Sequence, residues 1–400
     1  MSVRLVNEIP IQDITQNDLQ FLIDEEIVEN RTLEYKREIN VETGDDKKEF
    51  LADVSSFANA EGGDIIFGIE CDSGTKLPIN LYDVSRDGKD KDIQTLENII
   101  RDGIEPRMSF DINTIELSDN PDQGYAIIIR IKKGWDGPYR IKYKSNHRFY
   151  TRSSNGKYLM EMNELRTAFN LSETRIERIK TFVQTRLSNI YSNESSYPLG
   201  DGPILSLHLV PASSFDSGSY YDLSIISNKR ENPSYPMKYH SYNPIFNLDG
   251  FLKYSKLQNE PFAVSYLQYF RNGVIESACL LDHKGVDERK ISISSIEYLL
   301  FGPINGYIRD LESLGIISPF IIFISLINVK GCMISLQNRL FSEKGPDIYK
   351  DVVQLPDVYI EGYSQDIKKA LKPCFDVLAN LGGLSRSYSY DEDGNYIGEY

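Results

Sequence analysis

The chain has 400 residues, of which 40% are hydrophobic and 26% are charged, the proportions of a globular protein long enough for two domains. Its net charge of −15 excludes nucleic-acid binding by overall charge, although it leaves room for a local basic surface. The longest apolar run, residues 316–329, is interrupted by polar residues and is too short to cross a bilayer.

The cysteines and the N-terminus bear on the cellular compartment. Cys71, Cys279, Cys332 and Cys374 lie far apart, so the sequence predicts neither a metal-binding pair nor a disulfide framework. Residues 1–18 lack the basic start and the apolar stretch of a signal peptide. We therefore expect a cytoplasmic protein with no membrane partner.

Helix and strand patterns alternate through the first 170 residues. A turn leads into a strand within residues 29–39, and a helix with one apolar face follows at 45–60, ended by Gly62 and Gly63. The remaining predicted elements are strands at 64–70, 110–117, 125–132 and 149–152, helices at 92–102 and 162–170, and a turn at 120–124.

A second set of elements begins with a longer helix for which Ser172 is the predicted N-cap. The stretch at 192–203, rich in Ser, Asn, Pro and Gly, marks a domain boundary. Beyond it we expect strands at 204–210, 221–226, 262–270, 274–281 and after Ile316, and helices at 294–314 and 365–381. Residues 385–400 have the composition of a mobile tail.

These elements predict an α/β (α+β) protein with two lobes. The first is a domain with a mixed sheet and flanking helices, and the second is another mixed α/β lobe. The predicted divisions are an N-terminal segment at 1–19, the first domain at 20–170, a helix and linker at 171–203, a C-terminal α/β domain of unknown role at 204–384, and the tail at 385–400.

Glu34 and Lys36 are the first candidate site residues. Alternate residues of a strand share a face, so these two side chains project together, while Leu33 and Tyr35 point the other way. A carboxylate beside an ammonium suits phosphodiester hydrolysis, because the carboxylate can hold a divalent ion while the ammonium stabilises the phosphate. A lone Glu-x-Lys pair is also common on solvated surfaces, so it needs further support.

Further acids come from two nearby places. Glu29 precedes Glu34 by five residues, a spacing that brings the two together only if the chain turns near Asn30-Arg31. Glu70 ends the strand at 64–70, where a site can open, and Asp72 is a reserve ligand two residues on.

The same strand at 64–70 is expected to be continuous. On it Ile65, Phe67 and Ile69 share the face that packs on the helix at 45–60, while Asp64, Gly68 and Glu70 share the other.

Residues 130–157 carry nine basic side chains against the single acid Asp136, with aromatic residues interleaved. Such a segment can contact phosphates and stack on bases, although lysines also protect sheet edges. We predict nucleic-acid binding by Arg130, Lys132, Lys133, Arg140, Lys142, Lys144, Arg148, Arg152 and Lys157.

Three of these segments together resemble the AlbA-like domain of the Schlafen family, over about residues 20–170. Glu29-x-x-x-x-Glu34-Tyr-Lys36 resembles the family's E-S-x-x-x-E-F-K, and Phe57-Ala-Asn-Ala-Glu-Gly-Gly63 resembles its helix end. Phe149-Tyr-Thr-Arg152 resembles its closing segment. Asn30 replaces the usual serine, Glu70 stands where Asp is frequent, and Cys71 replaces the next acid.

The resemblance implies a divalent-metal-dependent endoribonuclease. Glu29, Glu34 and Glu70 match the family's three acids and would hold Mg²⁺ or Mn²⁺, with Lys36 at the scissile phosphate. Crowded carboxylates repel one another without a cation, which also predicts a metal. The implied substrate is structured RNA, above all tRNA, the implied setting is anti-phage defence, and a homodimer is expected.

Two other functions remain open. The first is a non-enzymatic DNA- or RNA-binding transcriptional regulator, in which the acids are only surface charge. The second is a nucleotide-binding sensor. A winged helix-turn-helix after residue 200 would favour the regulator, but the pattern there is rich in strands. No P-loop motif supports an ATPase.

Overall fold

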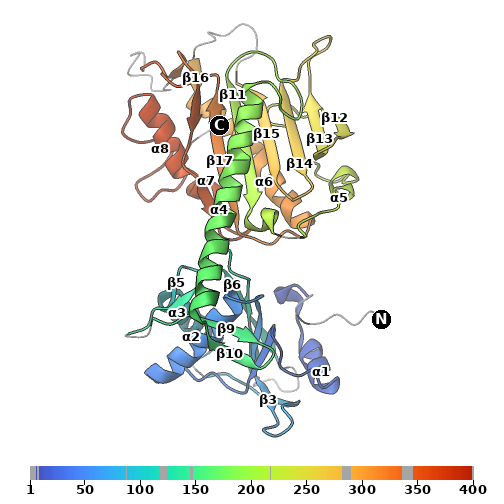
Figure 1. Ribbon diagram of the computed structural model, residues 1–400, viewed down its shortest axis with the longest axis vertical. Coiled ribbons are helices and arrows are strands. Elements are labelled where there is room, and N and C mark those ends of the chain that lie inside the picture. Colours follow the sequence, from blue (N-terminus) through green and yellow to red (C-terminus); the bar gives the residue numbers. More distant parts are fainter. Residues whose placement is uncertain are drawn as a thin grey trace. The chain divides into compact units, whose positions relative to one another are not determined.

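The computed structural model describes residue 6 and residues 9–86, 88–117, 124–144, 147–216, 218–281, 290–335 and 346–398. The chain divides into two compact units, Met1–Thr174 (unit 1) and Arg175–Tyr400 (unit 2), each built from helices and strands (Figure 1). The predicted α/β fold class is confirmed. No helix in the described parts of the chain is both long and apolar enough to span a membrane.

Unit 1 contains short helices and strands that alternate along the chain. Its helices are η2 (Ile11–Asp13), α1 (Gln16–Asp24), α2 (Gly44–Ala58), α3 (Lys89–Gly103) and the start of α4 (Met162–Tyr191). Its strands are β1 (Leu33–Lys36), β2 (Gly63–Phe67), β3 (Ile69–Cys71), β4 (Pro78–Leu81), β5 (Ile104–Glu105), β6 (Phe110–Glu116), β7 (Tyr125–Ile131), β8 (Arg140–Ile141), β9 (Tyr150–Ser153) and β10 (Gly156–Leu159).

A four-stranded mixed sheet, in the order β1-β2-β7-β6, forms the centre of unit 1. β1 runs parallel to β2, and the other neighbours are antiparallel. The apolar faces of α2 and α3 cover one side of the sheet, where Phe50, Val54 and Phe57 pack with Ile65 and Phe67. The N-terminal segment with α1 covers the other side. The site described below lies on the α2 side, at β1.

The predicted strand at 64–70 breaks at Gly68, which separates β2 from β3. Gly68 has φ +105, and a Cβ there would lie 2.6 Å from the Tyr82 carbonyl oxygen, so glycine is required. The break corrects the predicted face of Ile69, which packs with Ile66 on the α1 side rather than with Ile65 and Phe67.

Unit 2 is a large antiparallel sheet with helices on both faces. Its strands are β11 (Ile204–Pro211), β12 (Asn243–Phe246), β13 (Gly250–Ser255), β14 (Ser265–Phe270), β15 (Ile275–Leu280), β16 (Lys290–Ser292), β17 (Phe320–Ile327), β18 (Met333–Ser335), β19 (Val352–Gln354) and β20 (Val358–Ile360). Its helices are η3 (Ala212–Phe215), α5 (Ser224–Ser227), α6 (Ile293–Ser313), α7 (Ile367–Ala370) and α8 (Lys372–Leu381), besides the end of α4.

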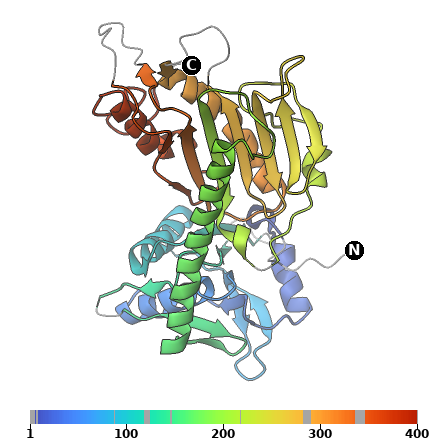
Figure 2. The same cartoon turned by 45° about the horizontal axis from the view of Figure 1, so that its top comes forward.

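The eight-stranded sheet of unit 2 follows the order β12-β13-β14-β15-β11-β17-β19, and β20 pairs with β17. The C-terminal part of α4 crosses one face, where Phe182 packs edge-on against Phe270 at 5.3 Å, and α6 lies behind the sheet (Figure 2). Helices α6 and α8 share the main core with the sheet. The sheet is therefore covered on both faces.

Three predicted features of the second half are wrong. Residues 162–191 form the single helix α4, and Ser172 lies inside it rather than capping a second one, because no Gly or Pro interrupts the segment. The strand predicted at 221–226 is instead the short helix α5, preceded by a turn in which Asp222 accepts from the Ser224 amide at 2.9 Å. The predicted tail packs inward, because Tyr390 is buried beside Phe375.

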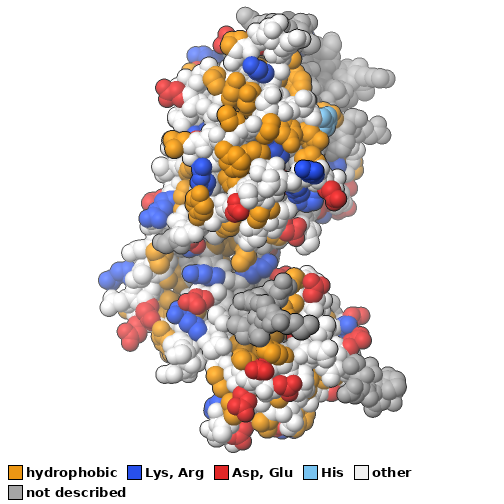
Figure 3. All heavy atoms as spheres, turned by 90° about the vertical axis from the view of Figure 1, so that its right-hand side faces the viewer, with side chains coloured by type: hydrophobic (Ala, Val, Ile, Leu, Met, Phe, Trp, Pro, Cys, Tyr) orange, Lys and Arg blue, Asp and Glu red, His pale blue; other side chains and the backbone are white. Residues whose placement is uncertain are grey.

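Hydrophobic side chains gather on one face of unit 2 (Figure 3). The edge strand β12 contributes Ile245 and Phe246, which are 50% and 55% exposed, and Leu248 follows at 95%. An uncovered edge of this kind can pair with another strand. The homodimer nevertheless stays a prediction.

Candidate functional site

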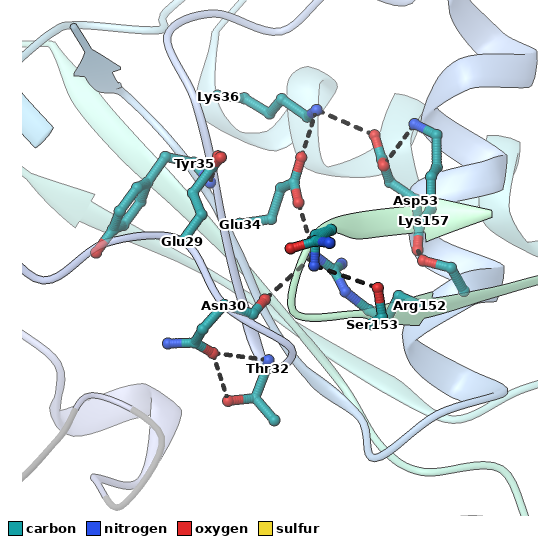
Figure 4. Close-up of polar contacts among 12 residues, drawn as sticks. Glu29, Asn30, Thr32, Glu34, Tyr35, Lys36, Asp53, Arg152, Ser153 and Lys157 are labelled. Atoms are coloured by element: carbon teal, nitrogen blue, oxygen red, sulfur yellow. Dashed lines mark hydrogen bonds and ion pairs between the residues drawn. The ribbon is translucent and has the colours of Figure 1, made fainter. Parts of the chain in front are cut away.

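The strand β1 presents Glu34 and Lys36 on one face, as its alternating pattern predicts. Leu33 and Tyr35 are buried on the other side of the sheet. Lys36 Nζ donates to Glu34 Oε1 at 2.9 Å, and both side chains are partly buried. The two residues therefore form one charged pair at the α2 side of the sheet (Figure 4).

Glu29 joins this region because the chain turns directly after it. Asn30 and Leu33 form an isolated bridge around the turn at Arg31-Thr32, and the Asn30 side chain accepts from the Thr32 amide at 2.8 Å. Glu29 Oε1 then accepts from the Tyr35 amide at 2.9 Å. The turn that the sequence required between Glu29 and Glu34 is present.

Asp53 of α2 is a site residue that the sequence reasoning missed. Its carboxylate lies 3.1 Å from Lys36 Nζ and 2.6 Å from Lys157 Nζ, which also reaches Glu49 at 2.5 Å. Only 4% of the Asp53 side chain is exposed. A charged residue within a helix segment that is otherwise apolar and buried was the available signal.

Arg152 of β9 is the second cation on Glu34. Its Nη2 donates to Glu34 Oε2 at 2.7 Å and to the Asn30 carbonyl oxygen at 3.4 Å. Its guanidinium lies flat near the Phe57 ring, 3.5 Å from the centroid, and only 1% of the side chain is exposed. Within the described residues, Nε and Nη1 find no hydrogen-bond partner.

We call Glu34, Lys36, Asp53, Arg152 and Lys157 the charge network. In it each carboxylate lies between two cations, and the five side chains come from three elements: β1, α2 and the β9–β10 hairpin. Burial disfavours the charged forms of Lys36 and Glu34. The charges of Asp53 and Glu34 nevertheless raise the pKa of Lys36, and Lys36 and Arg152 lower the pKa of Glu34. Glu34 and Lys36 are therefore both ionised at neutral pH.

Glu70 of β3 pairs with Arg37, a cation outside the charge network. Its Oε1 accepts from Arg37 Nη1 at 2.9 Å. Asp72 caps the turn that follows by accepting from the Gly74 and Thr75 amides at 3.0 and 2.7 Å. Asp72 therefore serves the loop between β3 and β4.

The Cys71 thiol feels the charge of all three predicted acids. Burial, followed by repulsion from Glu29, Glu34 and Glu70, raises the pKa of the thiol to about 11, although Lys76 opposes this. Burial, followed by repulsion from Glu34, also raises the pKa of Glu29, although the Tyr35 amide opposes this. The three carboxylates are thus within electrostatic range of one thiol.

The arrangement does not fit a divalent ion held jointly by Glu29, Glu34 and Glu70. Among the residues described, no group of three or more His, Cys, Asp or Glu side chains is placed to hold a metal ion. Both oxygens of Glu34 are engaged by Lys36 and Arg152, and one oxygen each of Glu70 and Glu29 is engaged by Arg37 and by the Tyr35 amide. The metal ligands Glu29, Glu34 and Glu70 stay a prediction.

Five of the nine predicted phosphate contacts are engaged inside unit 1. Arg130 binds both Asp64 oxygens, at 2.8 and 2.9 Å, and the Ile9 and Val6 carbonyls. Lys132 lies 3.3 Å from Asp111, and Arg140 donates to Glu105 at 2.9 Å. Arg152 and Lys157 belong to the charge network.

The other four basic residues remain at the surface. Lys133, Lys144 and Arg148 are exposed, and Lys142 is 58% exposed with Glu105 3.9 Å away. Lys144 lies over the Tyr143 ring at 5.4 Å. We call Lys133, Lys142, Lys144 and Arg148 the basic segment.

Comparison with known proteins finds one family model that matches part of unit 1. Residues 29–161 match the model of a family described as "Schlafen, AlbA_2". Among solved structures, the DIP2311 protein from Corynebacterium diphtheriae is 15% identical, with a TM-score of 0.25. That match covers 36% of this chain and 26% of the other, and likeness this weak supports no argument. No curated protein matches the chain.

Proposed function

Because unit 1 contains a Schlafen AlbA_2 domain over residues 29–161, which indicates a role with nucleic acid, we propose that this protein binds structured RNA through the basic segment. One observation carries the proposal. The exposed cations lie within the matched domain, on a stretch of 16 residues, 133–148, in a chain whose net charge is −15. Exposed lysine and arginine side chains can bind phosphates without first losing an internal partner.

An adjacent aromatic residue adds a second kind of contact. Tyr143 lies between Lys142 and Lys144 of the basic segment and is only partly buried. The Lys144 ammonium lies over its ring. An aromatic face among cations suits an unpaired base, which stacks while the backbone phosphates meet the lysines. Single-stranded loops of a structured RNA, such as those of tRNA, offer both features.

The test is RNA binding by a charge-neutralised variant. Lys133→Gln, Lys144→Gln and Arg148→Gln together should weaken binding of total tRNA by at least tenfold, measured by filter binding or fluorescence anisotropy. The matched control is Arg230→Gln, Lys256→Gln and Lys330→Gln, which removes the same charge from exposed residues of unit 2. Equal affinity in the two triple variants would refute this binding surface.

A second candidate function is RNA cleavage, because the Schlafen family includes nucleases. The observation that favours it is the charged pair of Glu34 and Lys36 on one face of β1, with Glu29 held at the same strand by the Tyr35 amide. Lys36 supplies a cation beside these acids, and a phosphate entering there would compete with Glu34 for it. Anti-phage defence is the setting that this candidate function would suit.

Cleavage is tested separately from binding. Total tRNA is incubated with the protein in Mg²⁺, Mn²⁺ or EDTA, beside Glu34→Gln and the control Glu38→Gln, an exposed acid two residues beyond Lys36. Cutting that stops in Glu34→Gln but continues in Glu38→Gln supports the nuclease. Binding without cutting under any metal leaves the protein a binder, and cutting by both variants removes Glu34 from the reaction.

A further inference from the structure

Unit 2 contains a cavity that nothing described so far uses. It has a volume of about 550 Å³, within the size range of small-molecule sites, and lies between the loop at 232–240 and one face of α6. His240, Tyr298, Gly302 and Arg309 line it and are exposed, so the cavity opens at the surface.

The charge of the cavity lining is opposite to that of the protein. Lys238 and Arg309 line it, together with His240, and no Asp or Glu is among its described lining residues. Because the chain carries 59 acids against 44 basic residues, such a lining favours an anionic ligand over a cationic one. Lys238 is held by the Leu280 carbonyl at 3.0 Å, which leaves Arg309 as the lining cation whose side chain has no partner among the described residues.

Aromatic rings form much of the wall. Tyr235, Tyr239 and Tyr298 all line the cavity, and Tyr235 packs edge-on against His240 at 5.4 Å. Tyrosine rings beside a cavity provide flat apolar surfaces on which a planar ligand stacks. The ligand is therefore expected to combine an aromatic ring with a negative charge.

The floor of the cavity exposes the backbone of α6. Gly302 lines it, and a Cβ at that position would meet nothing within 4 Å. Pro303 lies inside the helix and has no N–H, so the Leu299 carbonyl oxygen lacks the donor that the helix normally supplies. Leu299 also lines the cavity, so its carbonyl oxygen is a candidate acceptor for the amino group of a base.

We propose that this cavity binds a single nucleotide, with the base between the tyrosine rings and the α6 backbone and the phosphate at Arg309. An acceptor at Leu299 favours bases with an exocyclic amino group, which are adenine, cytosine and guanine, over uracil. A free nucleotide and the terminal nucleotide of an RNA share this chemistry. The site is independent of the basic segment of unit 1.

The experiment measures binding of AMP, UMP, adenosine and hexaadenylate RNA to the full chain by calorimetry. Gly302→Leu fills the open space and replaces glycine with a good helix former, so it should keep the thermal stability and abolish binding of AMP. Arg309→Gln should weaken AMP about tenfold and leave adenosine unchanged. Arg230→Gln, an exposed arginine outside the lining, should have no effect.

Each outcome decides the proposal. If AMP binds the parent and Gly302→Leu abolishes this binding, the ligand is a free nucleotide. If hexaadenylate binds more tightly than AMP and Gly302→Leu abolishes that binding too, the ligand is the end of an RNA. The proposal is overturned if neither ligand binds, or if both bind Gly302→Leu as well as the parent. Because the basic segment is unchanged in these variants, loss of nucleotide binding with intact tRNA binding separates this site from the proposed function.

Discussion

Arg152 is the most buried cation of the charge network, and its position explains why arginine stands there. It bonds Glu34 and the Asn30 carbonyl with one nitrogen and stacks on Phe57 with its flat face. A lysine has neither the planar fork nor the stacking surface. The residue ties the β9–β10 hairpin to β1 and α2.

Arg152→Lys should therefore destabilise unit 1. We expect the free energy of unfolding to fall by about 2 kcal/mol, the scale of a hydrogen bond to a charged group, measured by urea denaturation. The control is Arg31→Lys, because Arg31 is 51% exposed and only 3.4 Å from Glu61. Equal stability of the two variants would show that the buried contacts of Arg152 contribute nothing.

Glu276 is the corresponding buried charge of unit 2. Its side chain is fully buried and accepts from Arg186 twice, from Tyr266 and from His208 Nε2. His208 is itself fully buried within β11. Burial opposes the charge of Glu276, but Arg186 and His208 outweigh it and lower its pKa to about 2.

Glu276→Gln leaves Arg186 buried without its counter-charge, so it should cost about 3 kcal/mol of stability at pH 7. Because the pKa is lower in the folded state, the stabilisation by Glu276 is present above its ordinary value of 4.5 and is lost as the pH falls toward 2. Urea denaturation should show the gap between parent and variant narrowing over that range. Glu231→Gln, at an exposed site, should show no such gap at any pH.

At the scale of elements, the passage from α2 to β2 sets the position of the site. Gly63 has φ +142, and a Cβ there would lie 2.2 Å from the Thr32 carbonyl oxygen. This close approach holds the start of β2 against the turn that carries Glu29 to Glu34. Gly62-Gly63, predicted only as a helix stop, is therefore also a packing requirement.

Gly63→Ala should lower the free energy of unfolding by about 1–3 kcal/mol, because the backbone is strained and the carbonyl must move. Thermal denaturation followed by circular dichroism measures this. Gly74→Ala is the control, since its added Cβ comes no closer than 3.4 Å to a neighbour. A Gly63→Ala protein as stable as the control would contradict the packing argument.

Local patterns predicted most elements of unit 1, because its helices and strands carry clear periodicity. The two-residue period of a strand predicted that Glu34 and Lys36 share a face, and the spacing of apolar residues predicted the helix α2. The pattern could not reveal that Asp53 and Arg152 meet Glu34 and Lys36, because those contacts join segments 17 or more residues apart. It also missed the edge strand β12, whose four residues are all exposed and so lack the alternation that predicts strands.

At the scale of the whole molecule, the net charge of −15 makes RNA binding depend on a small surface. If the four cations of the basic segment contact phosphates, the logarithm of affinity should fall with the logarithm of salt concentration with a slope of about −3. Titrations of tRNA binding between low and physiological salt measure this slope. A slope near zero would contradict phosphate contacts, and a much steeper one would require a larger surface.

Ultraviolet crosslinking of bound tRNA, followed by mass spectrometry of the crosslinked peptides, tests the proposed RNA surface most directly. We expect crosslinks within residues 133–148, with Tyr143 among them, that disappear when Lys133, Lys144 and Arg148 are replaced by glutamine. Crosslinks confined to other parts of the chain, unchanged in that variant, would contradict it.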